Sequence, residues 1–274
     1  MHRWIAVACL LLLSVVFPLA AQPWRQSAAD ELVAVAGEQR LVLLGEMHGT
    51  QEIPQLVADV AERWSRSGPL LLAIEIHASE QASLAAYLHG DGTPAQRDAL
   101  RRRPYWSVPA SANDGRRSED MLELVEQVRR LRALGRDVAI LPFDVANGVS
   151  RGAEWRDRAM AACLRHAWDA LPDGRMLVLT GNVHAMRMRP AHAPPQMQTP
   201  MAVDLQDLRP YSVDITALAG QYWACRSSGC GPQPVTPGAQ GGRLDEAEAY
   251  DYRLVLPRFT IARPVAVEAA ADMH

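Results

Sequence analysis

The most informative part of the chain for its fold is Leu41-Val-Leu-Leu-Gly-Glu-Met-His-Gly-Thr-Gln-Glu52. Its aliphatic run stops at Gly45, and a carboxylate and an imidazole, Glu46 and His48, follow almost at once. A short apolar run bounded by glycine is typical of a strand that is buried on both faces, as in a parallel sheet. In such sheets the loops at the carboxyl ends of the strands form the crevice that holds a site. We therefore expect a buried strand here with chemistry at its carboxyl end.

Three more apolar runs, at 70–74, 138–141 and 176–179, end in the same way. The polar residues that follow them are Glu75 and His77, then Asp144, then Asn182 and His184. Segments with helical spacing alternate with these runs, which favours an α/β fold with a mainly parallel central sheet flanked by helices. Because the carboxyl ends of parallel strands share one edge, we expect the polar side chains to converge there, as active-site residues do.

The rest of the chain is less regular. Residues 90–118 are predicted to be an irregular insertion, equally suited to a binding loop and to a solvated connector. Further strands are expected at 201–205 and 211–215, a flexible glycine- and proline-rich loop at 227–243, and an edge strand at 250–256, followed by a loose C-terminal tail. There is no internal repeat, so residues 22–274 are expected to form a single α/β domain.

Residues 1–21 have the pattern of a cleaved secretory signal peptide, with a short charged start, an apolar stretch and small residues at its end. The stretch is shorter than the roughly 20 residues that a membrane span needs, so no stable span is expected after cleavage. The protein is therefore predicted to be secreted or periplasmic. Disulfides persist there, and Cys225 and Cys230 bracket a turn-like Arg-Ser-Ser-Gly segment, so a local bridge is expected. Cys163 fits a small buried hydrophobic residue instead.

The composition excludes several classes of function. A net charge of -3 over 274 residues argues against nucleic-acid binding, which needs a clustered basic face. The chain has 28 arginines and no lysine, which rules out a catalytic lysine. A small-molecule or peptide substrate remains the expected partner, and the oligomeric state is left open.

Carboxylates and imidazoles that face one crevice support two kinds of chemistry. They can bind a divalent metal, such as zinc or manganese, that activates water. A histidine oriented by a carboxylate can also deprotonate water without a metal. The residues alone leave both open. Gly148-Val-Ser-Arg-Gly152 matches the pattern of a nucleophile elbow around Ser150, but residues separate it from the preceding strand, so a turn is the favoured interpretation.

The two Gly-x-x-His motifs, Gly45-Glu-Met-His48 and Gly181-Asn-Val-His184, together with Glu75, resemble the superfamily of erythromycin esterases, ChaN-type haem-uptake proteins and Tiki/TraB-like proteins. The resemblance covers about residues 40–185. It implies that Glu46, His48, Glu75 and His184 line the site, as catalytic residues or as metal ligands. Second-tier candidates are Glu52, His77, Asp144 and Asn182. Members share the fold and this cluster but not one activity, since some hydrolyse a macrolactone, some are proposed metal-dependent peptidases, and some bind haem.

Together these observations predict an exported hydrolase-like protein that activates water for ester or amide cleavage through a Glu/His cluster, with or without a metal. The alternative is a periplasmic protein that binds haem or another iron ligand, in the manner of ChaN. Tyr87, Tyr105 and Tyr222 are its candidate haem ligands, and nothing in the sequence singles one out. The methionine-rich stretch at 186–201 is interpreted as structural, and the arginines at 101–103 as a solvated face.

Overall fold

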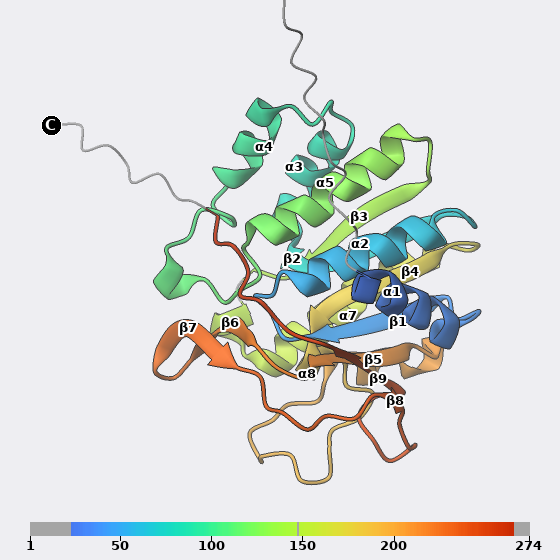
Figure 1. Ribbon diagram of the computed structural model, residues 1–274, viewed down its shortest axis with the longest axis vertical. Coiled ribbons are helices and arrows are strands. Elements are labelled where there is room, and N and C mark those ends of the chain that lie inside the picture. The colour runs from blue at the N-terminus through green and yellow to red at the C-terminus, as the bar shows by residue number, and fades with distance from the viewer. Residues whose placement is uncertain (1–22, 147, 266–274) are drawn as a thin grey trace, which may run out of the picture.

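A computed structural model describes residues 23–146 and 148–265 (Figure 1). The predicted signal peptide and most of the predicted tail lie outside these ranges. The fold is α/β, with a sheet of mostly parallel strands between two layers of helices, as the strand pattern predicted. No helix in the described ranges is long and apolar enough to cross a membrane.

The main sheet has the strand order β3-β2-β4-β1-β5-β9-β8. All neighbours pair in parallel except β8, which runs antiparallel to β9. The four strands that the sequence analysis singled out are therefore contiguous, with β4 between β1 and β2. Their bounds are β1 Leu41–Glu46, β2 Leu70–His77, β3 Val138–Asp144, β4 Arg175–Gly181, β5 Tyr211–Ala217, β8 Gly242–Arg243 and β9 Tyr252–Leu256.

Helices cover both faces of the sheet, which explains why the strands are apolar throughout rather than alternating. In β1, Val42 and Leu44 join one hydrophobic core, and Leu41 and Leu43 join the other. The first core lies under α1 Pro23–Ala36, α2 Glu52–Trp64, α3 Gln81–Leu88, α4 Pro94–Arg101 and α5 Glu119–Ala133. The second core lies under α7 Ala153–Asp169, α8 Asn182–Ala185 and the 3-10 helix η3 Met201–Leu208. The remaining helical elements are short, and they are η1 Ala78–Glu80, η2 Ala110–Ala112 and α6 Gly148–Arg151.

Several local predictions were wrong. The insertion at 90–118 is not wholly irregular, because Thr93 and Gln96 form a capping box that starts α4. The segment predicted as a strand at 201–205 belongs to η3, since Met201, Ala202 and Leu205 are buried at helical spacing. The strand predicted at the edge, β9, has β8 paired outside it.

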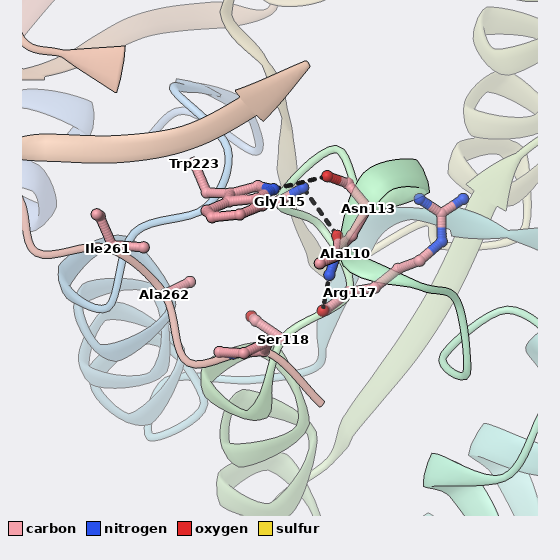
Figure 2. Close-up of a pocket in the computed structure, with 9 residues that line it drawn as sticks. Ala110, Asn113, Gly115, Arg117, Ser118, Trp223, Ile261 and Ala262 are labelled. Atoms are coloured by element: carbon pink, nitrogen blue, oxygen red, sulfur yellow. Dashed lines mark hydrogen bonds between the residues drawn. The ribbon is translucent and has the colours of Figure 1, made fainter. Parts of the chain in front are cut away.

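The glycine- and proline-rich segment predicted as a flexible loop contains half of a hairpin. Strand β7, Gly229–Pro234, pairs antiparallel with β6, Gln221–Arg226. The predicted disulfide between Cys225 and Cys230 is present and closes the hairpin near its turn. The bridge holds the two strands together in a segment whose composition favours a loop. The indole N–H of Trp223, on β6, donates to the backbone oxygen of Asn113 at 2.7 Å (Figure 2). The hairpin therefore packs on the insertion that precedes α5.

Candidate functional site

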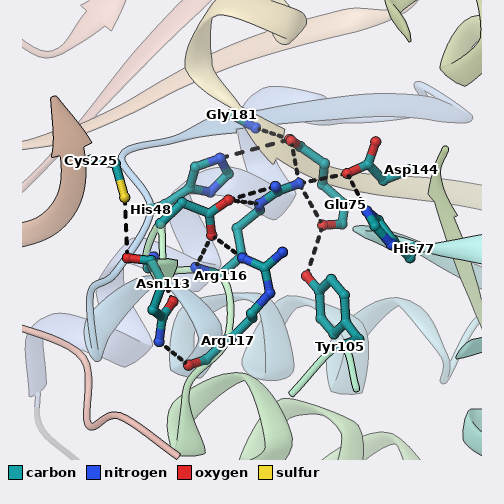
Figure 3. A network of polar contacts seen from close by, with 12 residues as sticks. His48, Glu75, His77, Tyr105, Asn113, Arg116, Arg117, Asp144, Gly181 and Cys225 are labelled. Carbon is teal, nitrogen blue, oxygen red and sulfur yellow. Dashed lines mark hydrogen bonds and ion pairs between the residues drawn. The ribbon is translucent and has the colours of Figure 1, made fainter. Parts of the chain in front are cut away.

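The carboxyl ends of β3, β2, β4 and β1 bring six of the predicted side chains into one polar cluster. Figure 3 shows His48, Glu75, His77 and Asp144 among them. We call this group, with the residues that bond to it, the Glu/His cluster. Glu75 stands at its centre and is 4% exposed. Ion pairs with Glu75 or Asp144 join His48, His77 and His184, and Glu46 pairs with His48. The predicted members of the cluster are therefore Glu46, His48, Glu75, His77, Asp144 and His184.

His48 forms a carboxylate–histidine pair with Glu46. Its Nδ1 lies 2.9 Å from Oε1 of Glu46, and its Nε2 lies 3.9 Å from Oε2 of Glu75. Burial alone would lower the pKa of His48, but the hydrogen bond to Glu46 and the charges of Glu75 and Glu46 outweigh it and raise the pKa above 6.5. The pair holds the ring with Nε2 directed towards Glu75.

His184 forms a second such pair, with Asp157 of α7. Nδ1 of His184 lies 2.7 Å from Oδ1 of Asp157, and Nε2 lies 3.8 Å from Oε1 of Glu75. Nη1 of Arg156 lies 2.8 Å from the same Nε2. Because a guanidinium only donates, Nε2 must accept, and Nδ1 therefore carries the proton that is donated to Asp157. The two carboxylate–histidine pairs thus direct their Nε2 atoms to different oxygens of one carboxylate.

Two guanidinium groups join Glu75 to Asp144. Nη1 of Arg116 donates to Oε1 of Glu75 at 2.9 Å and to Oδ2 of Asp144 at 2.7 Å. Arg156 donates through Nη2 to Oε1 of Glu75 at 2.6 Å and through Nε to Oδ1 of Asp144 at 2.8 Å. Burial would raise the pKa of Glu75, but His184, Arg116, His48 and Arg156 hold it well below its usual value. Glu75 is therefore ionised.

The other oxygen of Glu75 is bound by β4. Oε2 accepts from Oγ1 of Thr180 at 2.7 Å and from the backbone N–H of Gly181 at 2.6 Å. Hydrogen bonds to a carboxylate stabilise its charged form. The end of β4 therefore fixes the orientation of the carboxylate that both histidines face.

Close contacts explain why both Gly-x-x-His motifs begin with glycine. A Cβ on Gly181 would lie 3.0 Å from Nε2 of His48, so any side chain there would displace the imidazole. A Cβ on Gly45 would lie 3.1 Å from Cβ of Ala185 and from Cα of Asn182. Gly45 lets the end of β1 pack against α8, and Gly181 leaves room for His48.

His77 lies at the margin of the cluster. Its Nε2 is 4.0 Å from Oδ2 of Asp144, and its ring lies 5.4 Å from the ring of Tyr105. Burial lowers the pKa of His77, Asp144 opposes this, and Arg116 adds to it, so the pKa is below 6.5. His77 is therefore a neutral ring at neutral pH.

Two second-tier candidates make their contacts elsewhere. The carboxylate of Glu52 accepts from the backbone N–H of Thr260 at 2.8 Å, which ties α2 to the C-terminal segment. The side-chain oxygen of Asn182 accepts from the backbone N–H of Val183 at 2.9 Å, a local bond at the start of α8. These bonds give both side chains structural roles.

Among the charged residues that bond to the predicted members of the cluster, the sequence analysis missed Arg116, Arg156 and Asp157. Asp157 had a readable signal, because it is a charged residue on the buried face of α7 at helical spacing with Met160, Ala161 and Leu164. The arginines carried no such signal. The arginines that sequence analysis considered pair elsewhere, Arg101 with Glu119 and Asp98, and Arg103 with Glu80.

The donor set does not fit a divalent metal. Both oxygens of Glu75 and both of Asp144 already accept hydrogen bonds, mainly from guanidinium groups whose positive charge stands where a metal would have to stand. Within residues 23–146 and 148–265, no group of three or more His, Cys, Asp or Glu side chains has an arrangement that could hold a metal ion. The metal-ligand role considered for Glu46, His48, Glu75 and His184 is therefore not supported by this geometry.

Ser150 lacks the setting of a nucleophile elbow. Strand β3 ends at Asp144, and Ser150 lies exposed in the four-residue helix α6 instead of at a direct strand-to-helix turn. Cys163 is half-buried, and burial raises the pKa of its thiol, so it is not an activated nucleophile.

Solved structures share this fold. An erythromycin esterase variant, EreC in its open conformation, aligns with a TM-score of 0.64 at 12% identity, covering 88% of this chain and 95% of that one. A protein from Bacillus cereus aligns with a TM-score of 0.60 at 12% identity, covering 89% and 94%. ChaN of Campylobacter jejuni with cofacially bound haem aligns at 14% identity over 84% and 91% of the two chains, but its TM-score of 0.48 is too low to carry an argument.

No family model and no curated protein matches the chain. At these identities the solved structures establish the fold alone. The erythromycin esterase resemblance that the Gly-x-x-His motifs indicated is confirmed at that level, and the chemistry must be argued from the cluster itself.

Proposed function

We propose that the protein is an exported hydrolase that cleaves an ester or amide bond in a small molecule or peptide by attack of water. The observation that carries the proposal is the pair of carboxylate–histidine units, Glu46–His48 and Asp157–His184, that face the ionised carboxylate of Glu75. A histidine whose Nδ1 is held by a carboxylate presents Nε2 as a general base. Export is part of the proposal, and the Cys225–Cys230 disulfide supports it.

His48 is the better candidate for the base. Its Nε2 is beyond hydrogen-bond distance of Glu75, which leaves the lone pair on Nε2 able to accept a proton from a water molecule. Nε2 of His184 instead faces Arg156 at 2.8 Å. When His48 takes a proton from water, Glu46 and Glu75 stabilise the imidazolium that forms.

The guanidinium groups have two roles in this scheme. Arg116 and Arg156 keep Glu75 and Asp144 ionised, which fixes the charge around the histidines. They also supply positive charge within the cluster, which would offset negative charge on the carbonyl oxygen as water adds to it. Such preorganised charge is often the largest contribution to catalysis.

The haem alternative has less support. The phenol of Tyr87 donates to Glu126 at 2.8 Å, and the phenol of Tyr222 accepts from Arg226 at 2.7 Å. The phenol of Tyr105 is buried and lies 3.4 Å from the backbone oxygen of Glu75. All three candidate ligands are therefore engaged, and we favour the hydrolase.

The experiment is a substrate screen on the signal-cleaved protein. Aryl esters, lactones and peptide amides are tested with the wild type and with His48→Ala, His184→Ala and, as the matched control, the exposed His192→Ala. We expect His48→Ala to lower kcat/KM by about 100-fold or more and His192→Ala to leave it unchanged. Full activity in both His48→Ala and His184→Ala would overturn the proposal.

Two further measurements separate the alternatives. Labelling of the wild type but not of Ser150→Ala by a fluorophosphonate would favour the serine mechanism. A Soret shift on titration with hemin that is lost in Tyr87→Phe, Tyr105→Phe or Tyr222→Phe would favour haem binding. Metal content measured on protein purified without chelator tests the divalent-metal alternative in the same preparation.

A further inference from the structure

The loop at 113–117 is the segment that brings Arg116 into the Glu/His cluster (Figure 3). It is internally braced, because the side chain of Asn113 accepts from the N–H of Gly115 at 2.9 Å and donates to the backbone oxygen of Arg117 at 2.8 Å. Asp114 pairs with Arg116 at 2.6 Å. The loop should therefore move as one unit, and the position of Arg116 depends on what holds that unit.

Trp223 of the hairpin contacts the loop through both its side chain and its backbone. Its indole donates to the backbone oxygen of Asn113 at 2.7 Å. Gly115 has φ +99°, and a Cβ there would lie 2.4 Å from the backbone oxygen of Trp223, so only glycine permits this approach. The residue beside Arg116 is thus in direct contact with the hairpin.

The same tryptophan contacts the residue beside His48. The backbone N–H of Trp223 donates to the oxygen of Gly49 at 3.0 Å. Gly49 has φ +74°, and a Cβ there would also lie 2.4 Å from the oxygen of Trp223. One residue therefore joins the segment that carries His48 to the segment that carries Arg116.

The disulfide lies against the same insertion. The sulfur of Cys225 is 3.4 Å from the oxygen of Asn113, and that of Cys230 is 3.1 Å from the oxygen of Ser111. A disulfide sulfur has no hydrogen to donate, so these are packing contacts that hold the hairpin end over the loop. A cavity of about 90 Å³ remains between the loop, Trp223 and residues 261–264 (Figure 2). Packing on that side is incomplete, so the indole hydrogen bond is one of the few contacts that hold the loop from the side of the hairpin.

We infer that Trp223, on the disulfide-closed hairpin, is a positioning residue that sets the place of Arg116 relative to His48. Its consequence for catalysis rests on the proposed function, but the placement itself does not. Without the indole bond the loop would shift and carry the Arg116 guanidinium away from Glu75 and His48.

The titration of His48 reports this placement without any substrate. The charged groups that act on His48 are Glu46 on β1, Glu75 on β2, and Asp114 and Arg116 on the loop. Of these, Arg116 lowers the pKa of His48. Displacing Arg116 should therefore raise the pKa of His48. Loss of burial would raise it as well, and the two causes are separated by an Arg116→Gln background, in which only the second can still act.

The test is NMR titration of the His48 Cε1–H signal, assigned with His48→Ala. In Trp223→Phe, which keeps an aromatic ring but removes the indole N–H, the midpoint should lie at higher pH than in the wild type. Trp168→Phe, whose ring lies beneath Arg40, is the matched control and should not change it. In an Arg116→Gln background Trp223→Phe should add no further shift, which shows that Trp223 acts through Arg116.

An unchanged midpoint in folded Trp223→Phe would overturn the inference, as would an equal shift in the Arg116→Gln background. If Trp223→Phe does not fold, the Cys225→Ser/Cys230→Ser protein decides in its place, with a raised midpoint in support and an unchanged one against. Failure of the substrate screen with a shifted midpoint would contradict the hydrolase and leave the positioning role standing.

Discussion

The imidazoles of His48 and His184 face different oxygens of the Glu75 carboxylate, with Nε2 of His48 3.9 Å from Oε2 and Nε2 of His184 3.8 Å from Oε1. Each ring is held at Nδ1 by its own acid, Glu46 or Asp157. The two units have equivalent parts, but Nε2 of His184 also accepts from the guanidinium of Arg156 at 2.8 Å. The asymmetry distinguishes their expected roles.

The pH dependence of hydrolysis should reveal the base. Because the pKa of His48 is above 6.5 and only the neutral ring accepts a proton, the acidic limb of kcat/KM should lie above pH 6.5. Glu46→Gln should move this limb to lower pH, since the bond to Glu46 raises the pKa. A limb that is the same in wild type and Glu46→Gln would exclude His48 as the base.

Asp157→Asn should lower kcat with little change in fold. An amide can present its N–H₂ to Nδ1 of His184, which would place the ring proton on Nε2, where it would oppose Arg156. We expect a loss of kcat of about 10-fold or more, less than for His48→Ala, if His184 supports rather than performs proton transfer. Steady-state kinetics on both variants compares them, and a larger loss in Asp157→Asn would assign the base to His184.

Glu75→Gln should lower both stability and activity. Removing one partner from a buried ion-pair network leaves the guanidinium groups of Arg116 and Arg156 undercompensated, at a cost of about 3–5 kcal/mol. The free energy of unfolding in urea measures this. Glu52→Gln is the matched control, because Glu52 bonds to a backbone N–H outside the cluster, and an equal loss in the two variants would contradict the central role of Glu75.

Gly181→Ala should impair activity more than stability. Gly181 has φ -56° and ψ 143°, which alanine adopts readily, so the backbone tolerates the change. The new Cβ would lie 3.0 Å from Nε2 of His48 and push the ring from its place. Gly231→Ala, where a Cβ meets open space, is the control. Kinetics and thermal unfolding of both variants test this, and wild-type kcat in Gly181→Ala would contradict it.

Acid should weaken the fold through Glu126, which lies away from the Glu/His cluster. Burial would raise its pKa, but bonds from Arg129, Tyr87 and Arg130 lower it to about 2. A depressed folded-state pKa contributes stability that is complete above the unfolded value of 4.5 and is lost as the pH falls towards 2. Urea midpoints between pH 6 and pH 3 should fall less steeply in Glu126→Gln than in wild type. Glu62→Gln, which removes an exposed pair, should follow the wild-type slope.

Much of the fold was predictable because it depends on local hydrophobicity. Strands β1 to β4 are apolar runs that end at glycine or at an acid, and the burial of both sheet faces follows from that composition. The hairpin was missed because its contacts with the distant residues Gly49 and Asn113 outweigh its loop-like composition. Helix η3 was missed because the burial of Met201, Ala202 and Leu205 outweighs its strand-like appearance.

The order of residues along the chain is enough to place Glu46, His48, Glu75 and His184 after strand ends, and parallel strands direct their ends to one edge. Which groups complete the cluster depends on the packing of segments that are distant in the sequence. Arg116 lies on a loop that Trp223 contacts. Arg156 and Asp157 reach the cluster because of the orientation in which α7 packs on the sheet. In a chain whose basic residues are all arginine, composition does not show which arginines are buried. An arginine is buried where the fold buries carboxylates that it can pair with. The strand order β3-β2-β4-β1 places Glu75 and Asp144 close together, and Arg116 pairs with both.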